Sequence, residues 1–317
     1  MNFIQKSVLL LVLSASVAAG FPARGEEQSR YPQLEDRLRS EVEFLCDSMH
    51  RGRGFGTTEK FFSTGYIISS FKHAGLQPLQ GGYLHNFYSS GKPGRNVIGI
   101  RPSRYVSNGA KYILVASYSD GLGCLQGRIY PGADSNASGV AAVLALADSL
   151  KAGVKGIIFA VFDGRSAGMK GSYAFYDDLS KGRITDNSGN VIRPSQIALM
   201  VNIDIIGANL QPVRKFWKDY VIALGGERYF DSFPEANNGP GLNVDFEYYD
   251  SKDFTNLFYR KIGDQRVFLE HGIPCVVWTS GITQHTNKVS DTPETLNYPV
   301  FARRVELIRR WVRIQLD

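Results

Sequence analysis

The chain has 317 residues, of which 43% are hydrophobic and 12% aromatic, so it can bury a substantial core as one large domain. A charged fraction of 21% and 33 glycines are ordinary for a loop-rich α/β protein and exclude a disordered chain. The net charge is +6, and much of the excess lies in stretches such as Arg303–Gln315, where arginines alternate with apolar residues. That spacing is typical of a solvated helix face and does not indicate nucleic-acid binding.

The first residues have the parts of a secretory signal peptide. Lys6 supplies positive charge, Ser7–Ala19 is a short apolar run, and cleavage is expected near Ala18–Gly20. The run is too short to favour the alternative, a membrane-anchoring helix. The sequence therefore predicts a signal peptide over residues 1–20, a single domain over 21–317, and a secreted or periplasmic protein with no membrane span after cleavage.

Apolar periodicity then predicts helices and strands that alternate along the chain. In chain order these are helices Leu34–Ser48 and Thr58–Ala74, strands Asn96–Pro102 and Lys111–Ser117, helix Ala137–Ala152, strand Lys155–Phe162, helix Ala167–Leu179, a surface loop over 180–195, strands Ile197–Ile206, Tyr220–Gly226 and Val244–Tyr249, helix Phe254–Tyr259, strand Ile273–Trp278 and helix Tyr298–Leu316. Several strands are apolar throughout, as expected when helices cover both faces of a sheet. The fold class is therefore α/β, a three-layer α/β/α sandwich with a mixed, mostly parallel central sheet.

The three cysteines, Cys46, Cys124 and Cys275, are far apart and have no metal-binding spacing. One disulfide in an oxidising compartment and three free thiols both remain open. The apolar surroundings of Cys275 predict a buried strand residue.

Ligands of such folds bind beyond the carboxyl ends of the strands, so functional residues are expected in the segments that directly follow the strands. They are SYSDG at 117–121, FDGRSAG at 162–168, IDIIGAN at 203–209 and TSGITQHT at 279–286. The segment GADSN at 132–136 joins them, because it precedes a helix whose N-terminus would face the same rim.

Taken together, these segments resemble the co-catalytic zinc aminopeptidases and their relatives, the glutaminyl cyclases. Members typically read HxD, GADDNASG, FDGEExGLxGS, xxDxxG and HTxxDTxExL in that order, and this chain has SYSD, GADSNASG, FDGRSAGMKGS, VNIDIIGA and HTNKVSDTPETL. The resemblance spans nearly the whole chain after the signal peptide. It implies a zinc-exopeptidase fold, and for the aminopeptidases two zinc ions, a bridging carboxylate and a general-base glutamate.

Mapped residue by residue, the resemblance implies that most of this site is replaced. Ser117 and Ser119 stand at the first histidine and the aspartate after it, and Ser135 stands at the bridging aspartate. Arg165 stands at the general base and Ser166 at the next ligand; only Asp204 and His285 keep residues able to bind a metal. The cyclase pattern, with one zinc at the positions of Ser135, Ser166 and His285, keeps only the histidine. No cofactor is therefore expected, with zinc the alternative if the site is rearranged.

Neighbouring carboxylates are the alternative source of ligands, but we do not expect them to repair the pattern. Asp120, Asp134 and Asp163 lie beside the replaced positions, and adjacent residues of a strand or turn point in other directions. We expect Arg165 to fill the site and pair with Asp204, the alternative being a side chain extended into solvent. Without a metal, His285 is expected to bond Asp291 or Asp204. Gln265 marks one more changed polar position of the pocket.

Three functions compete. The first is a non-catalytic homologue that binds a peptide or another small ligand in the old cleft, which Tyr118, Trp217, Tyr220 and Trp278 would line unless they belong to the core. The second is an active exopeptidase or cyclase with a rearranged metal site. The third is a different hydrolase, for which the sequence has no nucleophile elbow. The combined loss of ligand, bridge and base favours the first.

Overall fold

The computed structural model describes residues 29–104, 109–209, 214 and 216–317. The expected signal peptide lies outside the described residues, so it stays a prediction. In the described part, no helix is both long enough and apolar enough to cross a bilayer.

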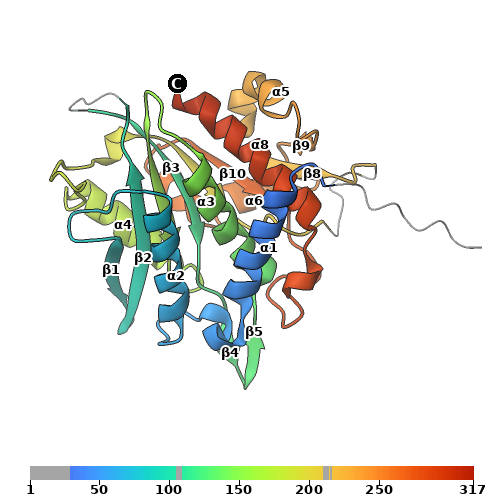
Figure 1. The fold of residues 1–317 in the computed structure, drawn as a ribbon, viewed down its shortest axis with the longest axis horizontal. Coiled ribbons are helices and arrows are strands. Elements are labelled where there is room, and N and C mark those ends of the chain that lie inside the picture. Colours follow the sequence, from blue (N-terminus) through green and yellow to red (C-terminus); the bar gives the residue numbers. More distant parts are fainter. Residues whose placement is uncertain (1–28, 105–108, 210–213, 215) are drawn as a thin grey trace, which may run out of the picture.

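A mixed sheet of eight strands forms the centre of the described structure (Figure 1). Its spatial order is β1 (Leu84–Ser89), β2 (Lys92–Arg101), β6 (Gly156–Phe162), β3 (Tyr112–Tyr118), β7 (Ile197–Ile203), β10 (Cys275–Thr279), β8 (Tyr220–Leu224) and β9 (Asn243–Asp245). The central strands β6, β3, β7 and β10 run parallel, while β1, β2 and β8 pair antiparallel with a neighbour. A separate small hairpin joins β4 (Gly123–Leu125) and β5 (Arg128–Tyr130).

Helices cover both faces of this sheet, which confirms the predicted three-layer sandwich. One face carries α1 (Pro32–Cys46), α2 (Lys60–His73), α3 (Ser138–Ser149), α5 (Phe233–Ala236) and α8 (Tyr298–Leu316). The other carries α4 (Lys170–Ser180), α6 (Lys252–Arg260) and α7 (Gln265–Leu269). Every residue of β3 and β6 is buried because both faces are covered, which explains their continuous apolar sequence.

The predicted elements are present, with differences that have local causes. The last strand before α6 is shorter than predicted, because Tyr249 and Asp250 adopt positive φ and Ser251 caps α6. The short elements α5, α7 and β4–β5 were not predicted, since each is too brief to show a period. All three cysteines are free, and Cys275 is buried in β10 as expected.

The C-terminal helix has its predicted bounds, but the prediction that its arginines are solvated is wrong for Arg304. This side chain is 0% exposed and donates hydrogen bonds to the backbone carbonyls of Tyr220, Ile206 and Ala208. Its burial depends on these acceptors, since an unpaired guanidinium could not be buried. The loop after β7 is therefore tied to α8 by a buried cation.

Candidate functional site

Polar segments that follow three neighbouring strands meet at one edge of the sheet. Ser117 and Asp120 lie at the end of β3, Asp163 follows β6, and Asp204 follows β7. Because β3 pairs in parallel with both β6 and β7, the carboxyl ends of these strands lie side by side. The structure therefore brings together the segments that the sequence singled out.

Asp120 holds the turn after β6 in place. Its Oδ1 accepts a hydrogen bond from the backbone N–H of Arg165 at 2.8 Å. Its Oδ2 accepts bonds from the backbone N–H of Ser166 at 2.9 Å and from Ser166 Oγ at 2.6 Å. Burial raises the pKa of Asp120, and the nearby Asp163 carboxylate raises it further. Both oxygens are engaged with the turn, so this carboxylate does not replace a lost ligand.

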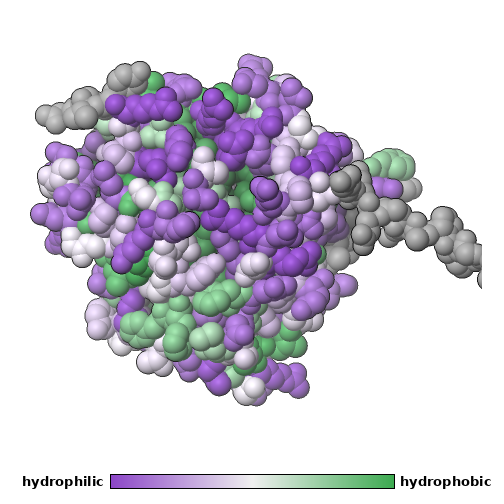
Figure 2. Space-filling view, viewed as in Figure 1, coloured by the Kyte–Doolittle hydropathy of each residue, from purple (hydrophilic) through white to green (hydrophobic). Residues whose placement is uncertain are grey.

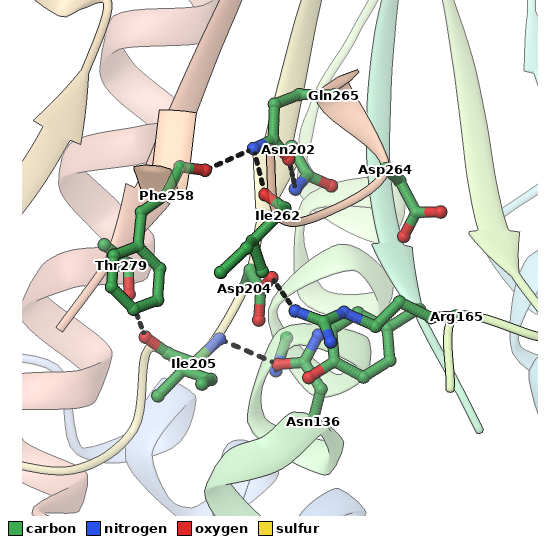
Figure 3. Close-up of polar contacts among 12 residues, drawn as sticks. Asn136, Arg165, Asn202, Asp204, Ile205, Phe258, Ile262, Asp264, Gln265 and Thr279 are labelled. Carbon is green, nitrogen blue, oxygen red and sulfur yellow. Dashed lines mark hydrogen bonds and ion pairs between the residues drawn. The ribbon is translucent and has the colours of Figure 1, made fainter. Parts of the chain in front are cut away.

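The side chain of Arg165 turns toward Asp204 (Figure 3). Its Nη2 lies 3.4 Å from Oδ2 of Asp204, and its guanidinium lies 4.8 Å from the centre of the Tyr118 ring. The Arg165 side chain is 26% exposed and that of Asp204 is 13% exposed. The expected pairing is therefore present, and the alternative with Arg165 extended into solvent is wrong.

A second cation reaches the same edge from α2. Nζ of Lys60 lies 2.7 Å from Oδ1 of Asp163 and 2.9 Å from Oγ of Ser119. The Lys60 and Asp163 side chains are only 4% and 3% exposed. The sequence motifs contain no signal for Lys60, although its helical spacing with Ile67 and Phe71 places it on the buried stripe of α2. An ammonium group thus stands beside Ser119, where the resemblance places a metal ligand.

Asp134 and Ser135 are held by groups of the protein itself. Oδ1 of Asp134 accepts bonds from the backbone N–H groups of Gly207 and Ala208. Ser135 Oγ donates to Oδ2 of Asp291 at 2.5 Å, and Asp291 is fully buried. Burial, together with Asp291, raises the pKa of Asp134 to about 7. Asp134 therefore supports the loop after β7, and a hydroxyl has taken the bridging position.

Ser117 also faces a neutral partner. Its Oγ accepts a hydrogen bond from Nδ2 of Asn136 at 3.2 Å, and Oδ1 of Asn136 accepts from the backbone N–H of Ile205 at 3.0 Å. Both Ser117 and Asn136 are buried. The first ligand position of the resemblance is thus part of an internal amide network.

The expectation for His285 is wrong. Its Nδ1 lies 2.9 Å from Oγ of Ser290, and its Nε2 lies 3.3 Å from the side-chain nitrogen of Gln284. Asp291, one of its expected partners, bonds Ser135, and Asp204 pairs with Arg165. The histidine fails to reach them because a local turn bonds it to its own loop.

Beside the Arg165–Asp204 pair lies a cavity of only about 30 Å³. Its apolar wall is formed by Leu224, Tyr248, Phe258, Ile262 and Val277. Gln265 closes one side, because its Nε2 donates to the carbonyls of Phe258 and Ile262 and its Oε1 accepts from Asn202 (Figure 3). A cavity of this size holds one or two water molecules and no side chain of a substrate.

The aromatic residues considered for the cleft wall mostly belong to the interior. Tyr220 and Trp278 are 1% and 0% exposed, and Trp278 packs in the main core. Tyr118 is buried beneath Arg165, and Trp217 lies beside Arg214. None of the four lines the cavity at Arg165.

The donor set at this edge does not fit zinc. Among the described residues, no group of three or more His, Cys, Asp or Glu side chains could hold a metal ion. Apart from Asp204 and His285, the residues at the ligand positions are the hydroxyls of Ser117, Ser119, Ser135 and Ser166, which cannot offset the charge of Zn²⁺. Asp204 already faces a guanidinium, which repels a divalent cation.

The family model of Peptidase family M28 matches residues 96–312. Among solved structures, the zinc aminopeptidase BSAP from Bacillus subtilis superposes with a TM-score of 0.66 at 14% identity, covering 89% of this chain and 95% of that one. LapA from Legionella pneumophila gives 0.67 at 13% identity, covering 90% and 74%. Glutaminyl cyclase from Fimbriiglobus ruber gives 0.65 at 17% identity, covering 89% and 95%. No curated protein sequence matches the chain significantly.

Proposed function

Because this chain belongs to peptidase family M28, we propose that it is a member without metallopeptidase activity that works as an exported binding protein. The observation that carries this proposal is the ion pair between Arg165 and Asp204, 3.4 Å apart. By resemblance, Arg165 stands at the general-base position and Asp204 is a metal ligand. This one ion pair thus puts a cation in place of the general base and engages the carboxylate that would bind the metal.

The chemistry supports the same conclusion. Hydrolysis by a zinc-bound water needs anionic ligands that hold the ion and a base that takes a proton from the water. A guanidinium stays protonated at any relevant pH, so Arg165 cannot accept that proton. The hydroxyls of Ser135 and Ser166 are engaged with Asp291 and Asp120. Within the part of the chain that the structure describes, no group of three or more His, Cys, Asp or Glu side chains could replace the lost ligands.

Ser119 and Lys60 do not form a substitute nucleophile and base. The distance of 2.9 Å between Lys60 Nζ and Ser119 Oγ is short enough for such a pair. However, Ser119 Oγ donates its own hydrogen to the carbonyl of Phe162 at 3.2 Å. The Lys60 ammonium is paired with Asp163 and has no lone pair with which to accept a proton. This argues against a serine hydrolase.

A binding role is supported by the character of the remaining cleft. Arg165 keeps 26% of its side chain exposed beside the apolar wall of the small cavity. A peptide end or a small molecule with both a polar and an apolar group would find matching partners there. Because the cavity is about 30 Å³, such a ligand must displace side chains when it binds.

The test is the metal content of the purified protein, measured beside assays with an aminoacyl-anilide and a glutaminyl peptide. We expect no stoichiometric zinc and no turnover, with or without added zinc. Tightly bound zinc, or turnover that a chelator abolishes, would favour the alternative of an active exopeptidase or cyclase with a rearranged site. A peptide and glycan array, with Arg165→Gln as the matched control, tests the binding role; the absence of any Arg165-dependent ligand would contradict it.

Export is tested separately. The secreted protein should lack the first residues, with its N-terminus near Ala18–Gly20 by intact-mass measurement. A full-length protein that stays in the cell would contradict export and leave the proposal of lost catalysis unaffected.

A further inference from the structure

A buried histidine lies in the Ser48–Arg53 turn between α1 and α2. His50 is 0% exposed, and its ring nitrogens make no hydrogen bond of good geometry within the described structure, where the carbonyl of Phe44 is only a weak contact. The ring packs edge-on against Phe44 at 5.0 Å and Phe62 at 6.4 Å. Phe44 and Phe62 are themselves exposed, and Figure 2 shows hydrophobic surface over the lower ends of α1 and α2. This environment accepts a neutral imidazole and opposes an imidazolium.

The backbone after His50 is strained. Arg51, Gly52 and Arg53 all adopt positive φ, at 44°, 70° and 55°. Positive φ is unfavourable for a non-glycine residue because its Cβ lies too close to the backbone, so contacts elsewhere must hold the turn. A Cβ added at Gly52 would lie 2.5 Å from the carbonyl oxygen of Tyr130, so the turn also fits closely against the β4–β5 hairpin. The backbone of this turn can therefore adopt few other conformations while it remains packed against the hairpin.

Arg53 connects this turn to the candidate site. Its side chain is 0% exposed and donates to the carbonyl of Ser119 at 3.1 Å and to that of Gly132 at 2.8 Å. It also donates to the carbonyls of Pro131 and Leu45, at 2.8 and 2.6 Å. Ser119 precedes Asp120, and Gly132 begins the turn that leads to Asp134. One guanidinium therefore holds, through neutral acceptors, two segments that lead to candidate-site residues. Neither segment lines the small cavity beside Arg165.

We propose that the Ser48–Arg53 turn is an acid-sensitive latch: when His50 takes up a proton, the turn opens and Arg53 releases the carbonyls of Ser119 and Gly132. The imidazole gains one proton from solvent, and only hydrogen bonds and packing contacts are broken. The inference goes beyond the proposed function and holds whether or not the cleft binds a ligand. It makes the arrangement of the two segments that begin at Ser119 and Gly132 depend on the pH of the surroundings.

Burial and the charges around the imidazole ring determine the direction in which the pKa of His50 shifts. Burial lowers the pKa of His50 and the Arg53 guanidinium lowers it further, while Asp47, at the end of α1, and the carbonyl of Phe44 raise it by less. Around the same turn, α2 contributes Tyr66, which stacks on Phe44, and the hairpin contributes Cys124, which accepts a bond from Arg51.

The folded pKa of His50 therefore lies below its ordinary value near 6.5. The open turn therefore binds the proton more readily than the closed turn. By linkage, the closed turn is most stable above the ordinary pKa of histidine and loses stability as the pH falls below it.

The experiment is amide hydrogen exchange of the whole protein between pH 7.5 and pH 5, corrected for the intrinsic pH dependence of exchange. Peptides covering 47–54, 119–124 and 131–137 should lose protection at the acidic end, because the open turn takes up the proton more readily than the closed one. Peptides from β3 and β6 should keep theirs. In His50→Phe, which keeps a ring between Phe44 and Phe62, the acid-induced loss should disappear.

A matched control is His73→Gln, because His73 is exposed at the end of α2. That variant should behave as the wild type. The latch is overturned if the wild type keeps its protection at pH 5, or if His50→Phe loses protection to the same extent. Should His50→Phe fail to fold, an NMR titration of the histidines in the wild-type protein decides, and a His50 pKa at or above 6.5 contradicts the proposal.

Discussion

Two pairs of a cation and a carboxylate stand at the same edge of the sheet and differ in depth. Lys60 and Asp163 are 2.7 Å apart, and each side chain is less than 5% exposed. Arg165 and Asp204 are 3.4 Å apart and are 26% and 13% exposed. The deep pair cannot lose one partner without leaving a buried charge, whereas water can reach the shallow pair. The two cations at this edge therefore have different consequences, one for folding and one for the charge of the cleft.

The largest effect is expected at the deep pair. Lys60→Met should lower the free energy of unfolding by about 3–5 kcal/mol, because it leaves the buried Asp163 carboxylate without its cation. Urea denaturation at pH 7.5 measures this change. The exposed Lys181, paired with Asp177 on α4, is a suitable control, since Lys181→Met should change stability by no more than about 0.5 kcal/mol.

The double variant Lys60→Met with Asp163→Asn sharpens this result. It removes both charges, so it should recover a large part of the loss caused by Lys60→Met alone. A loss for Lys60→Met that is as small as that of the surface control would mean that the deep pair does not support the fold.

The next effect concerns Asp264, a buried carboxyl group that forms an ion pair with neither Lys60 nor Arg165 in the described structure. Burial raises the pKa of Asp264 to about 7, although the Ser172 hydroxyl and Arg165 favour its charged form. This lies above the unfolded value near 3.9, so the folded protein keeps a proton that the unfolded chain releases. The contribution of Asp264 to stability therefore falls as the pH rises from about 4 to about 7.

Asp264→Asn should for this reason stabilise the protein at pH 8 by roughly 1–2 kcal/mol and change little at pH 4. The asparagine oxygen can still accept the bond that Ser172 donates, which spans 2.5 Å in the native protein. Thermal unfolding at the two pH values measures the difference. Equal effects at both would show that Asp264 is charged in the folded protein.

The smallest effect is expected at the shallow pair. A double-mutant cycle with Arg165→Gln and Asp204→Asn should give a coupling energy below about 1 kcal/mol, because the ions are 3.4 Å apart and partly solvated. Added salt should reduce it. A coupling comparable to the effect of Lys60→Met would remove the distinction between the two pairs.

The sequence predicted the fold well because the fold depends on long apolar patterns. The helix Tyr298–Leu316 has its predicted bounds, and α3 lies within the predicted Ala137–Ala152. The pairing of Arg165 with Asp204 was also predicted, since two opposite charges near one sheet edge leave few alternatives. The helices follow from the apolar pattern, whereas the ion pair was expected because the resemblance placed both residues at one site.

The buried cations could not be predicted in the same way. The spacing of Arg304 predicted a solvated helix face, and the motifs contain no signal for Arg53; each is buried because backbone carbonyls from distant segments surround it. The spacing of Lys60 does mark the buried face of α2, but only the fold brings Asp163 to it. His285 bonds Ser290 within its own turn, and no periodic pattern predicts the partner in such a turn.

The hold of Asp120 on the turn after β6 determines what other side chains would meet there. Arg165 and Ser166, whose N–H groups Asp120 holds, stand by resemblance at positions where glutamates are typical. With no metal ion bound, glutamates at these positions would face Asp120 and Asp204 with no cation between them. Placing glutamates in this turn should therefore weaken the protein unless a metal ion binds at the same time.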